Sequence, residues 1–205
     1  MSVFDTISNY LETNTPFVCY VKPNETVWDL LVQQTDEIIE FSNQAGFVFM
    51  PFHEGKKVVI PFQGNSYSQG NFENFETKSV ESFTSGYDQK ATFENLVSDG
   101  ITAIRKGDFD KVVLSRKESL NLADFDNISA FEKLIQLYPT TFVYCFYHPK
   151  IGTWLGATPE QLLKANTTQF QTMALAGTQK DQGSNEVIWP KKEQEEQQFV
   201  TDYIV

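Results

Sequence analysis

Lys111 is the first residue whose type and position point to chemistry. It begins the apolar run Lys111-Val-Val-Leu-Ser-Arg, directly after the turn-like segment Lys106-Gly-Asp-Phe-Asp. A lysine that is partly removed from water at a strand end has a lowered pKa, and it can then act as a base near neutral pH. The alternative is an ordinary lysine at a strand end that extends into solvent.

Glu160 is a candidate proton donor. It follows Pro159, just after the strand-like segment that contains Trp154 and Leu155. A carboxyl group beside such apolar side chains has a raised pKa, which suits a general acid. The alternative is a carboxylate in the first turn of a short helix, where it interacts favourably with the helix dipole.

Glu193 and Glu196 are candidate metal ligands because of their spacing on a predicted helix. Glu196 precedes Phe199 by three residues and Tyr203 by seven, so it shares the apolar face of that helix, and Glu193 lies three residues earlier. Carboxylates that face inward need a partner, because an unpaired buried charge is costly. Mg²⁺ would provide one, with waters and an anionic ligand completing its coordination. Alternatively, the two acids lie at the rim and complement the helix dipole.

Gly177 and Thr178 are candidates for substrate binding. They end the apolar segment Ala174-Leu-Ala-Gly-Thr178. A glycine lets a ligand approach the backbone closely, and the threonine hydroxyl or amide can hydrogen-bond a carboxylate. Many strands end in Gly-Thr without binding anything, so this pair carries weight only together with the other candidates.

Several common catalytic patterns are absent from the sequence. It has no Gly-rich phosphate loop, no HExxH metal motif and no GxSxG nucleophile motif. Its two histidines, His53 and His148, lie in unrelated contexts, and we expect structural roles for both. Cys19 and Cys145 have no metal-ligand spacing and are expected to be buried, reduced thiols. Acid–base chemistry would therefore rest on Lys, Glu, Asp, Tyr or Cys side chains.

The elements that must position these residues mix helices and strands. Apolar periodicity, capping residues and turn signals predict both kinds of element. The predicted helices are 2–12 with Ser2 as N-cap, 27–42, 88–106 closed by Gly107, 128–137 and 192–205, and the predicted strands are 16–21, 46–52, 57–62, 111–116, 141–147, 153–156 and further strands up to 175. A long loop is predicted for 63–86. Because strands and helices do not alternate regularly, the pattern favours an α+β fold over a doubly wound α/β fold.

Length and composition limit the classes of function. The chain has 205 residues, the size of one domain or of part of a larger one, and 40% of them are hydrophobic, which excludes wholesale disorder. Its 16 basic and 27 acidic residues give a net charge of −11, which argues against a nucleic-acid surface. No apolar run is long enough for a membrane span, and no leader pattern begins the sequence, so we expect a soluble cytoplasmic protein.

The final predicted helix stops at Val205 without a glycine, a proline or a polar tail. Helices usually end with a partner for their last carbonyl groups. We therefore expect this sequence to be a fragment of a longer protein, forming a single, incomplete domain over 1–205.

Four segments in this order resemble the chorismate-utilising enzymes, and within them the isochorismate synthases. They are Gly107-Asp-Phe-Asp-Lys-Val-Val-Leu-Ser-Arg116, Trp154-Leu-Gly-Ala-Thr-Pro-Glu-Gln-Leu-Leu163, Ala174-Leu-Ala-Gly-Thr178 and Lys192-Glu-Gln-Glu-Glu196. The resemblance implies two α/β lobes packed through large antiparallel sheets, with the active site between them. Residues 1–87 would be the family's variable N-terminal part, and 88–205 the first portion of its catalytic core.

The resemblance also implies a Mg²⁺-dependent reaction in which water adds at C2 of chorismate and the C4 hydroxyl leaves, for menaquinone or siderophore biosynthesis. By position, Lys111 would be the base that activates the water, and Glu160 the acid that protonates the departing hydroxyl. Glu196 would bind Mg²⁺ with Glu193 nearby. Gly177 and Thr178 would contact the substrate.

The sequence departs from the family in two ways. Gln197 follows Glu196, where the family commonly has histidine, and the family's second half is missing. We therefore expect little or no activity from these 205 residues alone. A salicylate synthase is an alternative, because it shares the lysine. So is a non-catalytic chorismate-binding module, and unpaired sheet edges would favour its self-association.

Overall fold

The computed structural model describes residues 2–62, 66–72, 90–180, 183 and 187–205. The chain divides into two compact units. The first unit comprises Met1–Val80 and Asp124–Pro159, and the second comprises Glu81–Ala123 and Glu160–Val205. Helices and sheet strands both occur, as the α+β prediction requires. The prediction of a single incomplete domain over 1–205 stays a prediction.

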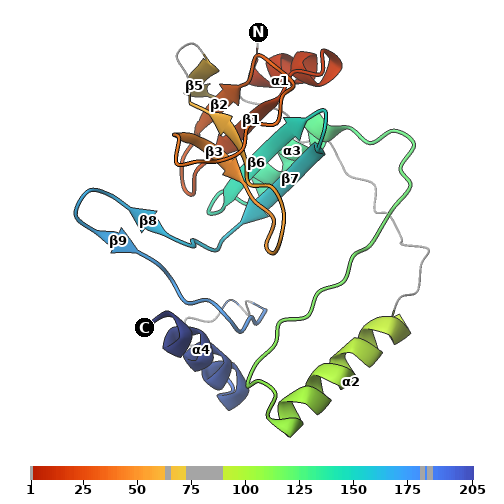
Figure 1. Cartoon of the computed structure of the whole chain (residues 1–205), viewed down its shortest axis with the longest axis vertical. Helices are drawn as coiled ribbons and strands as arrows, with labels where there is room; N and C mark the ends of the chain where they lie inside the picture. The colour runs from red at the N-terminus through yellow and green to blue at the C-terminus, as the bar shows by residue number, and fades with distance from the viewer. Residues whose placement is uncertain (1, 63–65, 73–89, 181–182, 184–186) are drawn as a thin grey trace. The chain divides into compact units, whose positions relative to one another are not determined.

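A five-stranded antiparallel sheet forms the centre of the first unit, in the order β5-β2-β1-β6-β7 (Figure 1). In the register of this sheet, Cys19 lies directly opposite Leu30 on one side and Cys145 on the other. β5 and β7 are the edge strands of this sheet among the described residues. The strands are β1 (Phe17–Val21), β2 (Val27–Val32), β5 (Tyr67–Asn71), β6 (Phe142–His148) and β7 (Gly152–Thr158).

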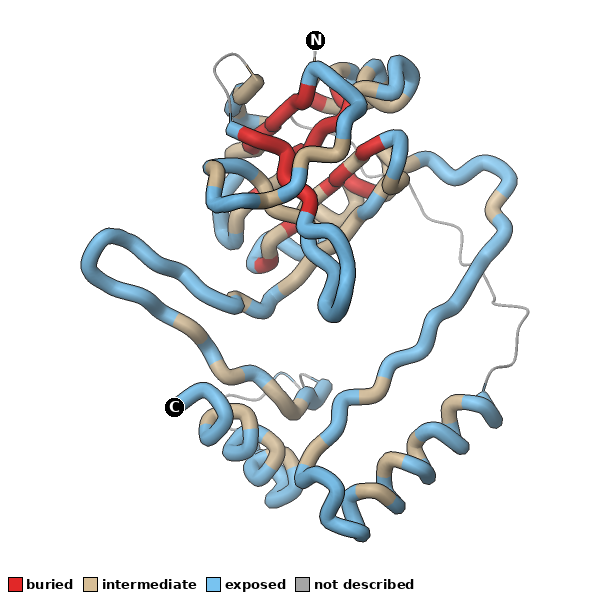
Figure 2. Tube along the Cα trace, viewed as in Figure 1, coloured by how far each residue is buried: buried red, intermediate tan, exposed pale blue. Residues whose placement is uncertain are grey.

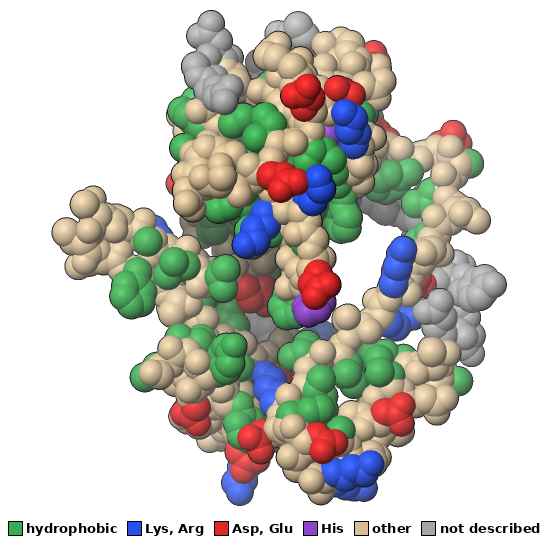
Figure 3. Space-filling view, in the orientation of Figure 1, with side chains coloured by type: hydrophobic (Ala, Val, Ile, Leu, Met, Phe, Trp, Pro, Cys, Tyr) green, Lys and Arg blue, Asp and Glu red, His purple; other side chains and the backbone are tan. Residues whose placement is uncertain are grey.

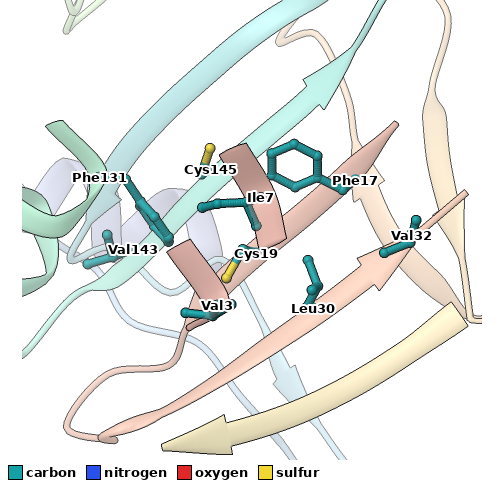
Figure 4. Packing of buried hydrophobic residues seen from close by; sticks show 9 residues of the cluster. All are labelled: Val3, Ile7, Phe17, Cys19, Leu30, Val32, Phe131, Val143 and Cys145. Carbon is teal, nitrogen blue, oxygen red and sulfur yellow. The ribbon is translucent and has the colours of Figure 1, made fainter. Parts of the chain in front are cut away.

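Two helices, α1 (Val3–Glu12) and α3 (Asn127–Leu137), pack on one face of this sheet. α1 begins with the predicted cap: Ser2 Oγ accepts a hydrogen bond from the Asp5 amide, and the Asp5 carboxylate accepts one from the Ser2 amide. Between the helices and the sheet lies a core of buried residues, which come from both sequence segments of the unit (Figure 4). Its members are Val3, Ile7, Phe17, Cys19, Leu30, Val32, Phe131, Val143 and Cys145.

The other face of the sheet is covered by a hairpin of β3 (Gly46–Phe49) and β4 (Val58–Pro61), both close to the predicted strands. Phe49 stacks on Phe146 of β6 with ring centroids 4.5 Å apart. Ile60 is buried with Val18 and Leu31 in the cluster that this packing forms. All buried residues among the described part of the chain belong to the first unit (Figure 2).

The predicted helix over 27–42 is wrong. Residues 27–32 form β2, and no helix is assigned to 33–42. A strand forms here instead of a helix because its residues alternate between two buried faces of the sheet. Leu30 belongs to the core on the helix side, and Leu31 belongs to the cluster on the hairpin side. Asp29, only 2% exposed, is paired with Lys22 at 2.8 Å and accepts a hydrogen bond from the Tyr67 hydroxyl at 2.6 Å.

The predicted loop over 63–86 is wrong where β5 interrupts it. Its other residues, except Ser66 and Phe72, lie outside the described part of the chain. β5 is polar, so it lacks the apolar alternation that marks a strand. Gly70 lets it pair closely with β2, because a Cβ there would come within 2.6 Å of the Trp28 ring.

The second unit contains α2 (Lys90–Lys106), the short strands β8 (Lys164–Ala165) and β9 (Phe170–Gln171), and α4 (Lys191–Ile204). α2 ends as predicted at Gly107, whose φ of 80° allows the turn. The amides of Gly107 and Asp108 donate to the carbonyls of Ile104 and Ala103, which is the Schellman pattern.

The strands predicted at 111–116 and up to 175 in this unit are largely wrong. No strand is assigned to 111–122 or 172–180, and only β8 and β9 pair within the described part of the unit. No strand pairs with the apolar residues at 112–114 within the described residues, and β character without a ladder leaves the backbone irregular. No described helix of the chain is long and apolar enough to cross a lipid bilayer.

Candidate functional site

All six candidate site residues belong to the second unit. Lys111 follows the turn that closes α2, and Glu160 begins the segment that leads to β8. Gly177 and Thr178 lie in the irregular segment after β9, and two glutamates lie on α4: Glu193 in its first turn and Glu196 one turn further on. The list of candidates thus draws on four separate stretches of sequence.

Lys111 and Glu196 come together. Lys111 Nζ lies 3.4 Å from Glu196 Oε1, and the two side chains are only 22% and 30% exposed. After the turn at Gly107 the chain runs back along α2, where Val112 and Leu114 lie next to Gly100. The structure therefore places the candidate base beside the candidate metal ligand.

Glu193 lies against the Gly177 backbone. A Cβ at position 177 would stand 2.8 Å from Glu193 Cγ and 2.9 Å from its Cβ, closer than real Cβ contacts. The absence of a side chain at Gly177 is thus what lets this segment lie on the first turn of α4. Lys192 Nζ also lies 3.4 Å from Glu193 Oε1, although the Lys192 side chain is 81% exposed.

Gln197 forms a second contact between the same two segments. Its Nε2 donates a hydrogen bond of 2.7 Å to the Ala174 carbonyl. Glu193 and Gln197 are one helical turn apart, so together they align 174–177 along α4. From the sequence, Gln197 stood out only as a departure from the family pattern. The signal that could have revealed its role is a long amide donor directly beside a candidate ligand.

Glu160 and Thr178 are both exposed. Trp154, which the sequence places near Glu160, belongs to β7 of the first unit, where its ring lies 5.3 Å from that of Phe49. The apolar surroundings expected for Glu160 therefore stay a prediction. Its role as an acid stays a prediction, as does the role of Thr178.

The described residues contain no group of three or more His, Cys, Asp or Glu side chains that could hold a metal ion. The pair on α4, Glu193 and Glu196, nevertheless fits Mg²⁺, which proteins commonly bind through one or two carboxylates while it keeps several waters. Both are glutamates three residues apart, and both side chains are partly buried, at 20% and 30% exposure. The donor set is thus suited to a hard divalent cation that completes its coordination elsewhere.

Residues 61–205 match the chorismate binding enzyme family. The chain belongs to this family. The resemblance seen in the four sequence segments is therefore confirmed at the level of the family, whose match covers the whole second unit and also residues 61–80 and 124–159 of the first. No solved structure matches the chain.

The relatives of this chain are named for different activities. The salicylate biosynthesis isochorismate synthase of Pseudomonas aeruginosa is 31% identical over 90 residues, which are 44% of this chain and 19% of that protein. Isochorismate synthase EntC of Escherichia coli K12 is 31% identical over 124 residues, 55% of this chain and 31% of its own length. Anthranilate synthase component 1 of Aeropyrum pernix is 33% identical over 88 residues, 42% and 19% of the two chains. The chain thus matches from 19% to 31% of the length of these relatives.

Proposed function

We propose that this chain carries part of the active site of a Mg²⁺-dependent isochorismate synthase. The observation that carries the proposal is the contact between Lys111 and Glu196, which brings together the proposed base and a proposed metal ligand. Two isochorismate synthases among its relatives support the same reaction. The two-lobed fold implied by the family, and a role in menaquinone or siderophore biosynthesis, belong to the proposal.

In this proposal Lys111 takes a proton from the water that attacks C2 of chorismate. Water is a poor nucleophile at neutral pH, so a positioned base lowers the barrier. On the other side, Glu160 gives a proton to the hydroxyl that leaves C4, because hydroxide is a poor leaving group. One water is consumed and one is released, so the reaction is an isomerisation.

Glu196 and Glu193 would hold Mg²⁺, which supplies a positive charge that clamps and orients a substrate carboxylate. Gly177 and Thr178 would contact the substrate, with the segment that contains them fixed on α4 by Gln197. This contact keeps the proposed substrate and metal residues in one assembly.

The test is product analysis with chorismate and Mg²⁺, using the protein at the length that its own cells make, established by intact mass. We expect isochorismate, and we expect Lys111→Ala to reduce turnover at least about a hundredfold, the usual contribution of a general base. Lys192→Ala is the matched control, because that lysine is exposed and pairs with Glu193 at the same distance. The control should retain near-parental turnover.

Other products would redirect the proposal. Salicylate, which is fluorescent, would indicate a salicylate synthase, and product formed only with ammonia would indicate an aminating relative. Near-normal turnover by Lys111→Ala would remove Lys111 from the role of base. If the parent binds chorismate in the presence of Mg²⁺ without any turnover, the chain is a binding module instead.

A further inference from the structure

Lys111 and a cation bound to Glu196 would compete for the same carboxylate. Lys111 Nζ lies 3.4 Å from Glu196 Oε1, within ion-pair range. Mg²⁺ binds carboxylate oxygens at about 2.1 Å. A cation on Glu196 would therefore stand only a few ångströms from the lysine ammonium, and two positive charges that close repel each other.

The burial of the pair determines how strongly Lys111 is held. The side chains of Lys111 and Glu196 keep 22% and 30% of their exposure, so water screens their attraction only in part. A lysine in such a position cannot turn into solvent without losing its partner and its packing. The ammonium is thus a fixed neighbour of Glu196.

The same helix provides an internal contrast. Lys192 Nζ also lies 3.4 Å from a glutamate oxygen, that of Glu193, but its side chain is 81% exposed. Exposed ion pairs contribute little, because the lysine moves freely into water. The two candidate metal ligands on α4 therefore differ in their neighbours: Glu196 lies beside a held lysine, and Glu193 beside an exposed one.

Resting on the proposed function, we propose that Lys111 sets the affinity of the Glu196 site for divalent cations. Its ammonium must be displaced from the carboxylate before the cation binds. Metal binding thereby releases Lys111 from Glu196, so the cation binds first and the lysine turns to the substrate afterwards. A low intrinsic metal affinity is the cost of keeping base and ligand adjacent.

The test is a titration of the protein, at the length that its own cells make, with Mn²⁺ as a spectroscopic substitute for Mg²⁺; free Mn²⁺ is measured by electron paramagnetic resonance, and Mg²⁺ is added as competitor. Lys111→Met removes the charge and keeps most of the side-chain length, whereas Lys111→Arg keeps the charge. We expect the Met variant to bind about tenfold more tightly, since a unit charge held about 5 Å from a divalent ion weakens binding by about that factor. We expect Lys111→Arg and the control Lys192→Met to stay within about twofold of the parent, because a held charge remains in one and only an exposed charge is lost in the other.

Glu196→Gln separates failure of this inference from failure of the proposed function. If that variant loses Mn²⁺ binding while Lys111→Met binds like the parent, the metal site stands and competition by Lys111 is overturned. If the parent binds no Mn²⁺, or Glu196→Gln binds it unchanged, the proposed metal site fails and this inference fails with it. Equal tightening in Lys111→Met and Lys192→Met would reveal a general charge effect and would also overturn it. Lys111→Gln serves as a second neutral variant should circular dichroism show that the Met variant is misfolded.

Discussion

The two units of this chain differ in how much of each is buried in a core. Every buried side chain among the described residues lies in the first unit, where helices and a hairpin cover both faces of the sheet. In the described part of the second unit no residue is buried, and large apolar side chains lie on the surface of α2 and α4 (Figure 3). All six candidate site residues belong to this second unit.

The comparison teaches that the geometry of the candidate site rests on a few single contacts. In the described residues these are the ion pair between Lys111 and Glu196, the hydrogen bond from Gln197 to Ala174, and the close approach of Gly177 to Glu193. A packed core distributes its free energy over many neighbours, whereas a set of separate contacts can be broken one at a time.

The largest difference between the units should appear when an aromatic ring is removed from each. Phe131 on α3 is fully buried, and Phe131→Ala should lower the free energy of unfolding by about 3–5 kcal/mol. Phe199 on α4 is 44% exposed, and Phe199→Ala should cost only about 0.5 kcal/mol. Urea denaturation of both variants, followed by far-ultraviolet circular dichroism, measures the two losses. Equal losses would contradict the contrast between a packed and an open unit.

A smaller effect is expected from two glycines of the second unit, with opposite signs. Gly177→Ala places a methyl group against Glu193 and should cost about 1–3 kcal/mol by forcing its segment away from α4. Gly100→Ala meets Val112 and Leu114 only at ordinary contact distance, and it should stabilise α2 by about 0.5–1 kcal/mol.

Hydrogen exchange of the α4 and α2 amides would measure both changes. Faster exchange in α4 for Gly177→Ala and slower exchange in α2 for Gly100→Ala are the expected results. Unchanged exchange in α4 would mean that the Gly177 segment does not lie on this helix in solution.

The smallest effect concerns pH and the first unit. His148 is buried; its Nδ1 accepts a hydrogen bond from the Lys150 amide, and its Nε2 lies 3.4 Å from the Glu37 carbonyl. Burial lowers the pKa of His148, so below about pH 6.5 the unfolded chain binds more protons than the folded one. The contribution of His148 is therefore fully present above that pH, and it is lost as the pH falls through the lowered pKa of the folded state.

Unfolding in urea at pH 7.5 and at pH 5.5 tests this expectation. We expect His148→Gln to show a smaller loss of stability between the two values than the parent. His53→Gln is the control, because His53 is exposed. If His148→Gln keeps the whole pH dependence, other groups are responsible for it.

Elements with local signals could be predicted from the sequence. Ser2 indicates the start of α1, where it forms a capping box. Gly107 indicates the end of α2, because the turn there requires a positive φ. β2 was missed because adjacent Leu30 and Leu31 look like part of a helical stripe, whereas each serves a different face of a doubly covered sheet. That second covering depends on the distant hairpin, which no local pattern reveals.

The candidate site, too, could be predicted from the sequence only in part. The residue types were recognisable from the sequence, since Lys111 and Glu196 lie in family-like segments. Their contact was not, because an ion pair between a turn and a distant helix depends on the path of the chain. The contribution of Gln197 was missed for a related reason: its partner is a backbone carbonyl, and every residue has one.

The pairing of β1 with β6 also places two cysteines where their reactivity reports on the opening of the sheet. Cys19 and Cys145 are the only cysteines of the chain; they lie opposite each other in the first unit, and neither is exposed. Burial raises the pKa of both thiols, that of Cys145 to about 12, so neither forms a reactive thiolate while the sheet is intact. The rate at which a thiol reagent labels the protein therefore measures the opening of the first unit alone. Opening of the second unit does not contribute to it, because that unit contains no cysteine.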